Sequence, residues 1–323
     1  MPNHQSLRGV YAAALTPLKP DFSLALDDLP AFLGFLARRG CHGALLMGTT
    51  GEGPSFSADE RLALLRAGLA VRQEHPDFRL LLGTGTPSLE ETVQLTRAAF
   101  DLGVDGVVVL PPYYFRKVSD DGLFAWFSQV IQRAVPTNAA LLGYHIPSLS
   151  GVPLSLDLLA RLKDAFPDQF AGLKDSSADA DHARRLGVRF GPDLLVFSGT
   201  DSLFSLALEQ GASGCITALA NLRSPDLRKV WEAFQAGGAE PAAQGCLDAA
   251  REVMGRYPPN PPLYKALLAQ LHPFALWAVR PPLLPMETGR ADQALAEAQA
   301  EVEAFASEDY SAVKPGASDY RAL

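Results

Sequence analysis

The chain has 323 residues, of which 48% are hydrophobic and 20% charged, as is typical of a globular protein with a sizeable core. Its formal net charge of −8 argues against nucleic acid or an anionic membrane surface as the main partner. No apolar run is long enough to cross a bilayer, and the start lacks the basic and apolar regions of a signal peptide.

The three cysteines are Cys41, Cys215 and Cys246, which are widely spaced and form no metal or redox motif. An odd number of scattered cysteines favours reduced, mostly buried thiols rather than a disulfide framework. We therefore expect a cytoplasmic protein.

Short apolar runs alternate with amphipathic stretches at a nearly regular interval. Each run is continuous and bounded by Gly, Pro, Thr or Ser, which is typical of strands buried on both faces of a parallel sheet. The predicted strands are Gly9–Leu15, Gly43–Met47, Leu80–Gly83, Gly106–Leu110, Ala140–His145, Phe170–Leu173, Leu194–Phe197 and Gly214–Leu219. The predicted helices are Leu26–Arg39, Ala58–Glu74, Leu89–Leu102, Asp121–Arg133, Leu156–Ala165, Ala180–Leu186, Ser202–Gln210 and Pro225–Gln235, with capping candidates at Ser57, Ser88, Ser155 and Ser224.

Eight strand–helix pairs predict an α/β fold, a (β/α)8 TIM barrel over residues 1–236 that carries the active site. A doubly wound open sheet is the alternative, but Thr16-Pro17-Leu18-Lys19-Pro20 after the first strand is no dinucleotide fingerprint. Residues 237–310 predict a C-terminal helical appendix and residues 311–323 a polar tail. The helices expected in the appendix are Ala242–Met254, Pro262–Leu271 and Ala291–Ala306.

One lysine stands in an unusual place. Lys174 follows Phe170-Ala171-Gly172-Leu173, an apolar run that predicts a buried strand. Burial is costly for an ammonium group and favours the neutral amine, which can attack a carbonyl and form a Schiff base. A lysine at a strand end with its tip in water is the alternative.

Other polar residues follow neighbouring strands, and the active site of such a barrel lies at the carboxyl ends of its strands. The turn Gly48-Thr49-Thr50-Gly51-Glu52-Gly53 offers hydroxyls and N–H groups that suit a small carboxylate, although it also reads as a plain turn. Tyr113, Tyr114 and Tyr144 follow or end the fourth and fifth strands; they are either packing residues or hydroxyls able to relay a proton. Together with Lys174, these groups suit Schiff-base chemistry on a 2-oxo acid.

The remaining candidates are weaker. His145 follows Tyr144, so alternation along a strand points it away from the barrel interior, and the other histidines show no metal spacing. Lys265 falls on a predicted helix and is expected to be solvated. Asp175 and Asp201 end strands, where capping of loops is the expected role.

In combination these segments resemble the pyruvate-dependent class I aldolases typified by dihydrodipicolinate synthase and N-acetylneuraminate lyase. The resemblance runs in order over roughly residues 7 to 300. It rests on Gly48-Thr49-Thr50-Gly51-Glu52, Pro112-Tyr113-Tyr114, Tyr144-His145-Ile146-Pro147-Ser148-Leu149-Ser150-Gly151, Gly172-Leu173-Lys174-Asp175, Ser198-Gly199-Thr200-Asp201 and Gly211-Ala212-Ser213-Gly214. It implies a lyase that acts on a small-molecule 2-oxo acid, is commonly a homotetramer built as a dimer of dimers, and needs no metal or organic cofactor.

The resemblance also implies catalytic roles. Lys174 is similar to the Schiff-base lysine, and Tyr144 to the proton donor and acceptor beside it. Thr49 is similar to the threonine that links the tyrosines, and Tyr114 to the tyrosine that completes the relay from a neighbouring subunit.

Three further positions are similar to substrate-binding positions of the family. Thr50, together with Thr49, would hold the pyruvate carboxylate in the turn that Gly48 opens. Ile216 falls where the family supplies a backbone carbonyl near the substrate.

Departures from the family pattern bear on the substrate. In the synthase branch an arginine that grips the second substrate's carboxylate stands where this chain has Leu149, whereas Leu149-Ser150-Gly151-Val152 resembles the lyase branch. Arg280-Pro281-Pro282 is similar to the sugar-acid aldolases, and another arginine could bind the distal end of a substrate. The sequence thus predicts an aldolase or lyase that releases or consumes pyruvate, with a 2-keto-3-deoxy sugar acid, 4-hydroxy-2-oxoglutarate or a sialic-acid-like compound as substrate. The alternatives are dihydrodipicolinate synthase, a keto-acid dehydratase, or a non-catalytic keto-acid binder.

Overall fold

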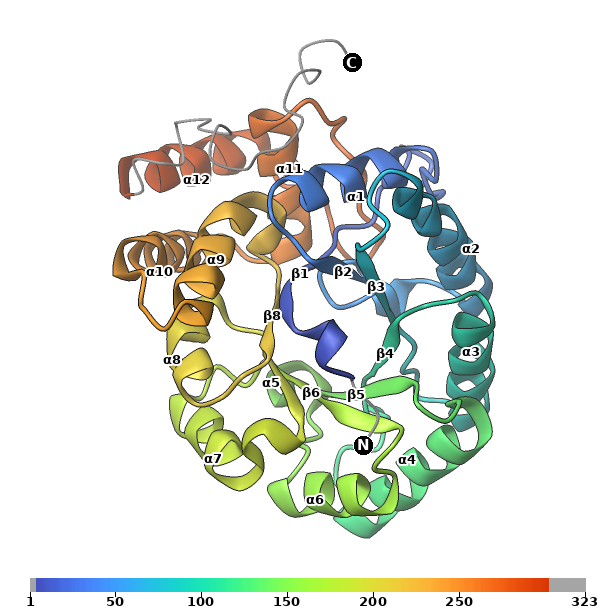
Figure 1. Cartoon of the computed structure of the whole chain (residues 1–323). Coiled ribbons are helices and arrows are strands. Elements are labelled where there is room, and N and C mark those ends of the chain that lie inside the picture. The colour runs from blue at the N-terminus through green and yellow to red at the C-terminus, as the bar shows by residue number, and fades with distance from the viewer. Residues whose placement is uncertain (1–3, 302–323) are drawn as a thin grey trace.

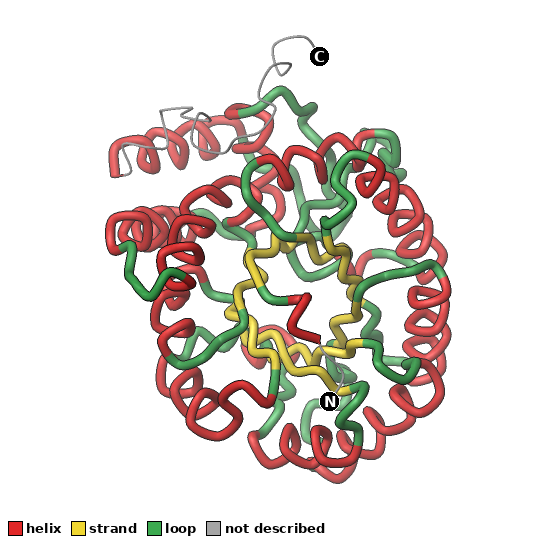
Figure 2. Tube along the Cα trace, in the orientation of Figure 1, coloured by secondary structure: helices red, strands yellow, loops and turns green. Residues whose placement is uncertain are grey.

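The fold is a closed barrel of parallel strands surrounded by helices, as Figures 1 and 2 show, in a computed structural model that describes residues 4–301. The strands are β1 (Gly9–Ala13), β2 (Gly43–Leu46), β3 (Arg79–Gly83), β4 (Gly106–Val109), β5 (Ala140–His145), β6 (Phe170–Asp175), β7 (Leu195–Ser198) and β8 (Gly214–Thr217). They pair in chain order, and β1 closes the barrel on β8. The predicted TIM barrel is therefore confirmed, and the open sheet is excluded.

The helices that follow the strands form the outer ring. They are α1 (Asp28–Arg38), α2 (Ala58–Gly68), α3 (Leu89–Asp101), α4 (Asp120–Ala134), α5 (Pro147–Ser150), α6 (Leu156–Ala165), α7 (Ala180–Phe190), α8 (Phe204–Glu209) and α9 (Ala220–Gln235). Ser57, Ser88 and Ser155 each accept a backbone N–H with their hydroxyls and so cap α2, α3 and α6 as expected. Ser224 lies inside α9, one residue after a kink at Arg223, because this helix begins five residues earlier than predicted.

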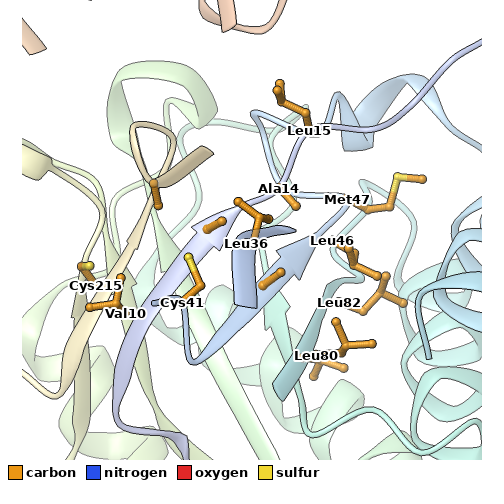
Figure 3. Close-up of a cluster of buried hydrophobic side chains, with 14 of the residues drawn as sticks. Val10, Ala14, Leu15, Leu36, Cys41, Leu46, Met47, Leu80, Leu82 and Cys215 are labelled. Atoms are coloured by element: carbon orange, nitrogen blue, oxygen red, sulfur yellow. The ribbon is translucent and has the colours of Figure 1, made fainter. Parts of the chain in front are cut away.

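Two layers of apolar side chains hold the barrel together. The larger cluster lies between the strands and the helices, and Figure 3 shows a part of it that includes Cys41, Leu46 and Cys215. The smaller cluster fills the barrel interior and includes Leu7. Leu7 belongs to the short 3-10 helix His4–Leu7, which Figure 2 shows within the ring of strands. A large side chain buried in either layer contributes about 1.5–3 kcal/mol.

An irregularity in β6 sets the direction of its last residues. Leu141 of β5 pairs with Phe170 and Leu142 pairs with Gly172, so Ala171 is one extra residue in β6. Because of this bulge Phe170 and Leu173 both pack in the outer cluster, where strict alternation would place them on opposite faces. The next residue, Lys174, therefore faces the barrel interior. Gly172 approaches β7 so closely that a Cβ there would lie 2.0 Å from the carbonyl oxygen of Leu195.

Three helices follow the barrel, and Figure 1 shows α10 beside α9. They are α10 (Pro241–Arg256), α11 (Asn260–Leu271) and α12 (Thr288–Glu301). The segment after α11 packs on α1, where the Trp277 indole donates a hydrogen bond of 2.9 Å to Asp28 and its ring lies 5.1 Å from that of Phe32. The boundary expected at residue 236 stays a prediction. The expected tail 311–323 and the end of the expected helix Ala291–Ala306 lie outside the described residues.

Candidate active site

Lys174 and Tyr144 lie side by side at the carboxyl end of the barrel. They are partners in the register of β5 and β6, and both are buried, with exposed fractions of 3% and 5%. The Lys174 Nζ lies 4.4 Å from the centroid of the Tyr144 ring. No salt bridge joins Lys174 to a carboxylate in residues 4–301, so its amine faces a phenol rather than an acid.

The Tyr144 hydroxyl connects the lysine to the turn after β2. It lies 3.2 Å from the Oγ1 of Thr49, within hydrogen-bond distance. Burial alone would raise the pKa of Tyr144, but the charge of Lys174 and hydrogen bonds from Thr49, Ser176 and Lys174 outweigh it and lower the pKa. The phenol is therefore suited to exchange protons with groups in the barrel mouth. Ser176 was not foreseen, although it follows Lys174 by two residues and strand alternation puts both on one face.

Backbone hydrogen bonds between residues close in sequence form the turn that carries Thr49 and Thr50. The Glu52 N–H donates to the Thr49 carbonyl at 3.1 Å, and the Gly53 N–H donates to the Gly48 carbonyl at 3.0 Å. From the loop after β1, Thr16 donates a 2.6 Å hydrogen bond to the Gly51 carbonyl. Gly48 and Thr50 are buried, and Thr49 is half-buried. These hydrogen bonds fix the backbone that carries the Thr49 and Thr50 hydroxyls.

The other predicted site residues are Ile216 and Tyr114. Ile216 is on β8 with its side chain fully buried in the barrel interior. Tyr114 follows β4 and is 77% exposed, and its ring contacts that of Phe115 at 5.3 Å. Within residues 4–301, Tyr114 makes no hydrogen bond or ring contact with Tyr144, so this chain alone does not complete the predicted tyrosine relay.

Directly behind Lys174, the outer face of the barrel carries a polar cluster that spacing did not reveal. His145 pairs with Asp175 in the register, and its ring stacks at 4.7 Å on that of His182 from α7. These three residues are the one group in residues 4–301 whose ligand atoms converge as a metal site requires, within 4.8 Å. However, the Nδ1 of His145 accepts the Leu154 N–H at 3.0 Å, which leaves the ring proton on Nε2. A metal-bound histidine instead donates its second N–H, so this group does not fit a metal.

Comparisons with known proteins agree with this arrangement. A family model, the dihydrodipicolinate synthetase family, matches residues 6–301. The chain belongs to this family. It is 41% identical over 281 residues to an uncharacterised DapA-like lyase of Chloroflexus aurantiacus. The aligned region covers 86% of this chain and 92% of the relative.

Solved structures of the dihydrodipicolinate synthetase family share the barrel. Dihydrodipicolinate synthase of Agrobacterium tumefaciens is 32% identical with a TM-score of 0.80, covering 90% of this chain and 98% of that one. YagE of Escherichia coli K12, solved in complex with pyruvate, is 25% identical with a TM-score of 0.84, covering 91% and 98%. The chain is accordingly an enzyme, a lyase of the pyruvate-dependent class I aldolase type. No helix within residues 4–301 is both long and apolar enough to cross a membrane.

Lys265 corrects one expectation about this family member. The prediction that it is solvated is wrong, because its side chain on α11 is only 1% exposed. Its Nζ donates to the Glu52 Oε1 and to the Ala278 carbonyl, both at 2.6 Å. Burial lowers the pKa of Lys265, and the Glu52 carboxylate opposes this effect. Of the two lysines that are buried within residues 4–301, Lys265 is paired with an acid and Lys174 is not.

Two more charged residues near the mouth are engaged with protein partners. The Arg280 guanidinium donates to Glu60, to the Ser55 carbonyl and to the Phe22 carbonyl, so those bonds would have to break before it could bind a substrate. The fully buried Asp201 accepts from Arg251 of α10 at 3.3 Å. Burial raises the pKa of Asp201, and Arg251 opposes the shift. The region after the barrel is thus hydrogen-bonded, through Arg251 and Arg280, to loops at the barrel mouth.

Proposed function

We propose that the chain cleaves or forms a carbon–carbon bond in a 2-oxo acid through a Schiff base on Lys174, with pyruvate as product or donor. The observation that carries this proposal is the buried Lys174 amine, which has no carboxylate partner within residues 4–301 and lies against the ring of Tyr144, whose hydroxyl contacts Thr49. A lysine in such a position is placed to act as a nucleophile toward a ketone.

The proposed reaction uses these residues in sequence. The neutral Lys174 amine attacks the C2 ketone, and Tyr144 supplies and removes protons as water leaves and the imine forms. The hydroxyls of Thr49 and Thr50 hold the substrate carboxylate. Tyr144 then takes the proton of the C4 hydroxyl, the C3–C4 bond breaks, its electron pair enters the imine to give an enamine, and an aldehyde leaves. Protonation at C3 and hydrolysis release pyruvate and restore the free lysine.

The substrate class follows from the residue at position 149. Leu149 lies on α5 with 61% of its surface exposed, and a leucine cannot bind the carboxylate of aspartate semialdehyde as an arginine fork would. We therefore favour cleavage of a 2-keto-3-deoxy sugar acid, 4-hydroxy-2-oxoglutarate or a sialic-acid-like compound. A family dehydratase would share the imine step.

Two observations favour dihydrodipicolinate synthase as the second candidate. Relatives of the chain carry this name, as does the Agrobacterium structure. Arg116 also lies beside the segment that carries Leu149, since a Cβ on Gly151 would come within 2.6 Å of the Arg116 Cδ. A guanidinium from the neighbouring loop could stand in for the absent arginine, and condensation of pyruvate with aspartate semialdehyde would test this.

We further propose a cytoplasmic homotetramer, a dimer of dimers in which a neighbouring subunit contributes Tyr114. The exposed Tyr114 and Phe115 rings support a subunit contact at this loop. A fully active monomer in solution would contradict it.

The test of the proposed function is mass spectrometry after incubation with pyruvate and borohydride. We expect a pyruvate-derived adduct on the peptide that contains Lys174, and none in Lys174→Ala. Lys265 is the internal control, because it is equally buried but bonded to Glu52. No adduct from folded protein would favour a non-catalytic keto-acid binder, and an adduct on Lys265 would refute the role given to Lys174.

A further inference from the structure

Beyond the groups that face the substrate, the site depends on a buried ion pair that reaches it from outside the barrel. The Glu52 side chain is 0% exposed and that of Lys265 is 1% exposed. The two carboxylate oxygens of Glu52 have different partners: Oε1 accepts the Lys265 Nζ at 2.6 Å, and Oε2 accepts the Arg280 backbone N–H at 2.9 Å. Both partners come from the region after the barrel, so this region fixes where Glu52 lies.

Glu52 also belongs to the turn that carries the Thr49 and Thr50 hydroxyls. Its backbone is left-handed, with φ 57° and ψ 26°, and its N–H closes on the Thr49 carbonyl at 3.1 Å. The next residue is closely packed, since a Cβ on Gly53 would lie 2.0 Å from the Met47 carbonyl oxygen. Because the Glu52 N–H is bonded to the Thr49 carbonyl, a shift of the Glu52 backbone would also move Thr49.

We propose that Lys265 is a positioning residue: through Glu52 it holds the turn Gly48–Glu52 so that the Thr49 hydroxyl meets the hydroxyl of Tyr144. Lys265 itself is committed to Glu52 and to the Ala278 carbonyl and does not point at the substrate. Misplacement of a reacting group by about 1 Å can lower a rate about 100-fold, so a distant brace can matter as much as a neighbour. The inference rests on the proposed imine chemistry for its kinetic readout.

The test is a double-mutant cycle between Lys265 and Thr49. Lys265→Met, Thr49→Val and the double variant are compared in the exchange of the pyruvate C3 protons for deuterium. We expect each single variant to exchange about tenfold more slowly or worse, and the double variant to be no slower than the worse single one, since both remove the same contact. A residue that only stabilises the fold would instead give multiplicative losses.

A second readout needs no pyruvate. The Thr49 hydrogen bond is one of the contacts that lower the pKa of Tyr144. In protein labelled with 13C at the tyrosine ζ carbon, we expect Lys265→Met and Thr49→Val each to raise the pKa of Tyr144, with no further rise in the double variant. The Tyr144 signal is assigned with Tyr144→Phe. If wild-type protein forms no imine, the proposed function fails, and this titration still decides the positioning role.

Two further variants keep the test decisive. If Lys265→Met does not fold, Glu52→Gln takes its place, because glutamine keeps the volume and an acceptor oxygen but removes the charge. Arg256→Met is the matched control, because the ion-pair partners of Arg256 are Glu252 of α10 and two acids of α12. We expect the control to leave both readouts unchanged. A folded Lys265→Met or Glu52→Gln protein with wild-type exchange and an unchanged Tyr144 pKa would overturn the proposal.

Discussion

Replacement of Tyr144 by phenylalanine separates catalysis from stability at this site. The ring stays in its buried place against Lys174, and the hydroxyl is lost together with its 3.2 Å contact to Thr49 and its hydrogen bonds to Ser176 and Lys174. A hydrogen bond of this kind contributes about 0.5–1.5 kcal/mol to folding. Because three such bonds are lost, while Thr49 is half-buried and can reach water, we expect a loss of stability of about 1–3 kcal/mol. A domain with about 5–15 kcal/mol of stability remains folded after such a change.

The catalytic effect should be much larger. Positioned proton transfer contributes about 100-fold to 10,000-fold, which corresponds to about 2.7–5.5 kcal/mol in the activation barrier. We therefore expect Tyr144→Phe to slow pyruvate C3 exchange, followed by NMR in deuterium oxide, by at least about 100-fold. The KM for pyruvate should change far less, because the carboxylate is assigned to Thr49 and Thr50.

Tyr11→Phe is the matched control for this substitution. Tyr11 lies on β1 in the barrel interior, is fully buried, and its hydroxyl has no hydrogen-bond partner in residues 4–301. Its loss should leave exchange unchanged and stability equal or higher, since an unpaired buried hydroxyl is costly. Exchange by Tyr144→Phe within about threefold of wild type, or an equal fall in the control, would refute the role of the Tyr144 hydroxyl.

Further predictions concern the substrate, the oligomer and pH. Leu149→Arg should raise condensation of pyruvate with aspartate semialdehyde about tenfold or more in a coupled assay, because guanidinium–carboxylate hydrogen bonds contribute about 1.5–3 kcal/mol each; an unchanged rate would contradict the importance of this position. If subunits share Tyr114, mixing Lys174→Ala with Tyr114→Ala protein under exchange of subunits should restore part of the activity that each has lost, and no restoration would argue against sharing. The hydrogen bonds from Arg280 lower the pKa of Glu60 from 4.5 to about 2. That contribution to stability is complete above about pH 4.5 and is lost as the pH falls toward 2, so Glu60→Gln should destabilise less at pH 3 than at pH 6 in urea unfolding; equal effects would show that the ion pair contributes nothing.

The sequence predicts the barrel well because its signals are local. Continuous apolar runs such as Ala140–His145 mark strands buried on both faces, and their regular interval leaves few other topologies. The same alternation correctly directs His145 outward, where its ring meets His182. The meeting itself was not predictable, because it depends on how α7 packs against the strands.

Lys265 shows where such reasoning ends. A lysine on an amphipathic helix is expected in water, and the acid that draws it inward, Glu52, is 213 residues away in the chain. The apolar run Phe170–Leu173 likewise stops two residues before β6 ends, because Lys174 and Asp175 lack the apolar character by which a strand is recognised, although both were expected at the end of this strand. In both cases a charged residue lies where its local sequence disfavours it, and its partner or its role comes from distant segments.

The bulge at Ala171 decides which residue at the end of β6 faces the barrel mouth. If the same residues paired with β5 without the bulge, simple alternation from Phe170 onward would shift the following residues by half a period. Asp175 would then occupy the place of Lys174, and an acid would replace the amine at the mouth, with no side chain substituted there. A relative with one residue fewer at the position of Ala171 would keep the lysine inward by simple alternation, so the pairing with β5, and not the length of β6, decides which residue faces the mouth.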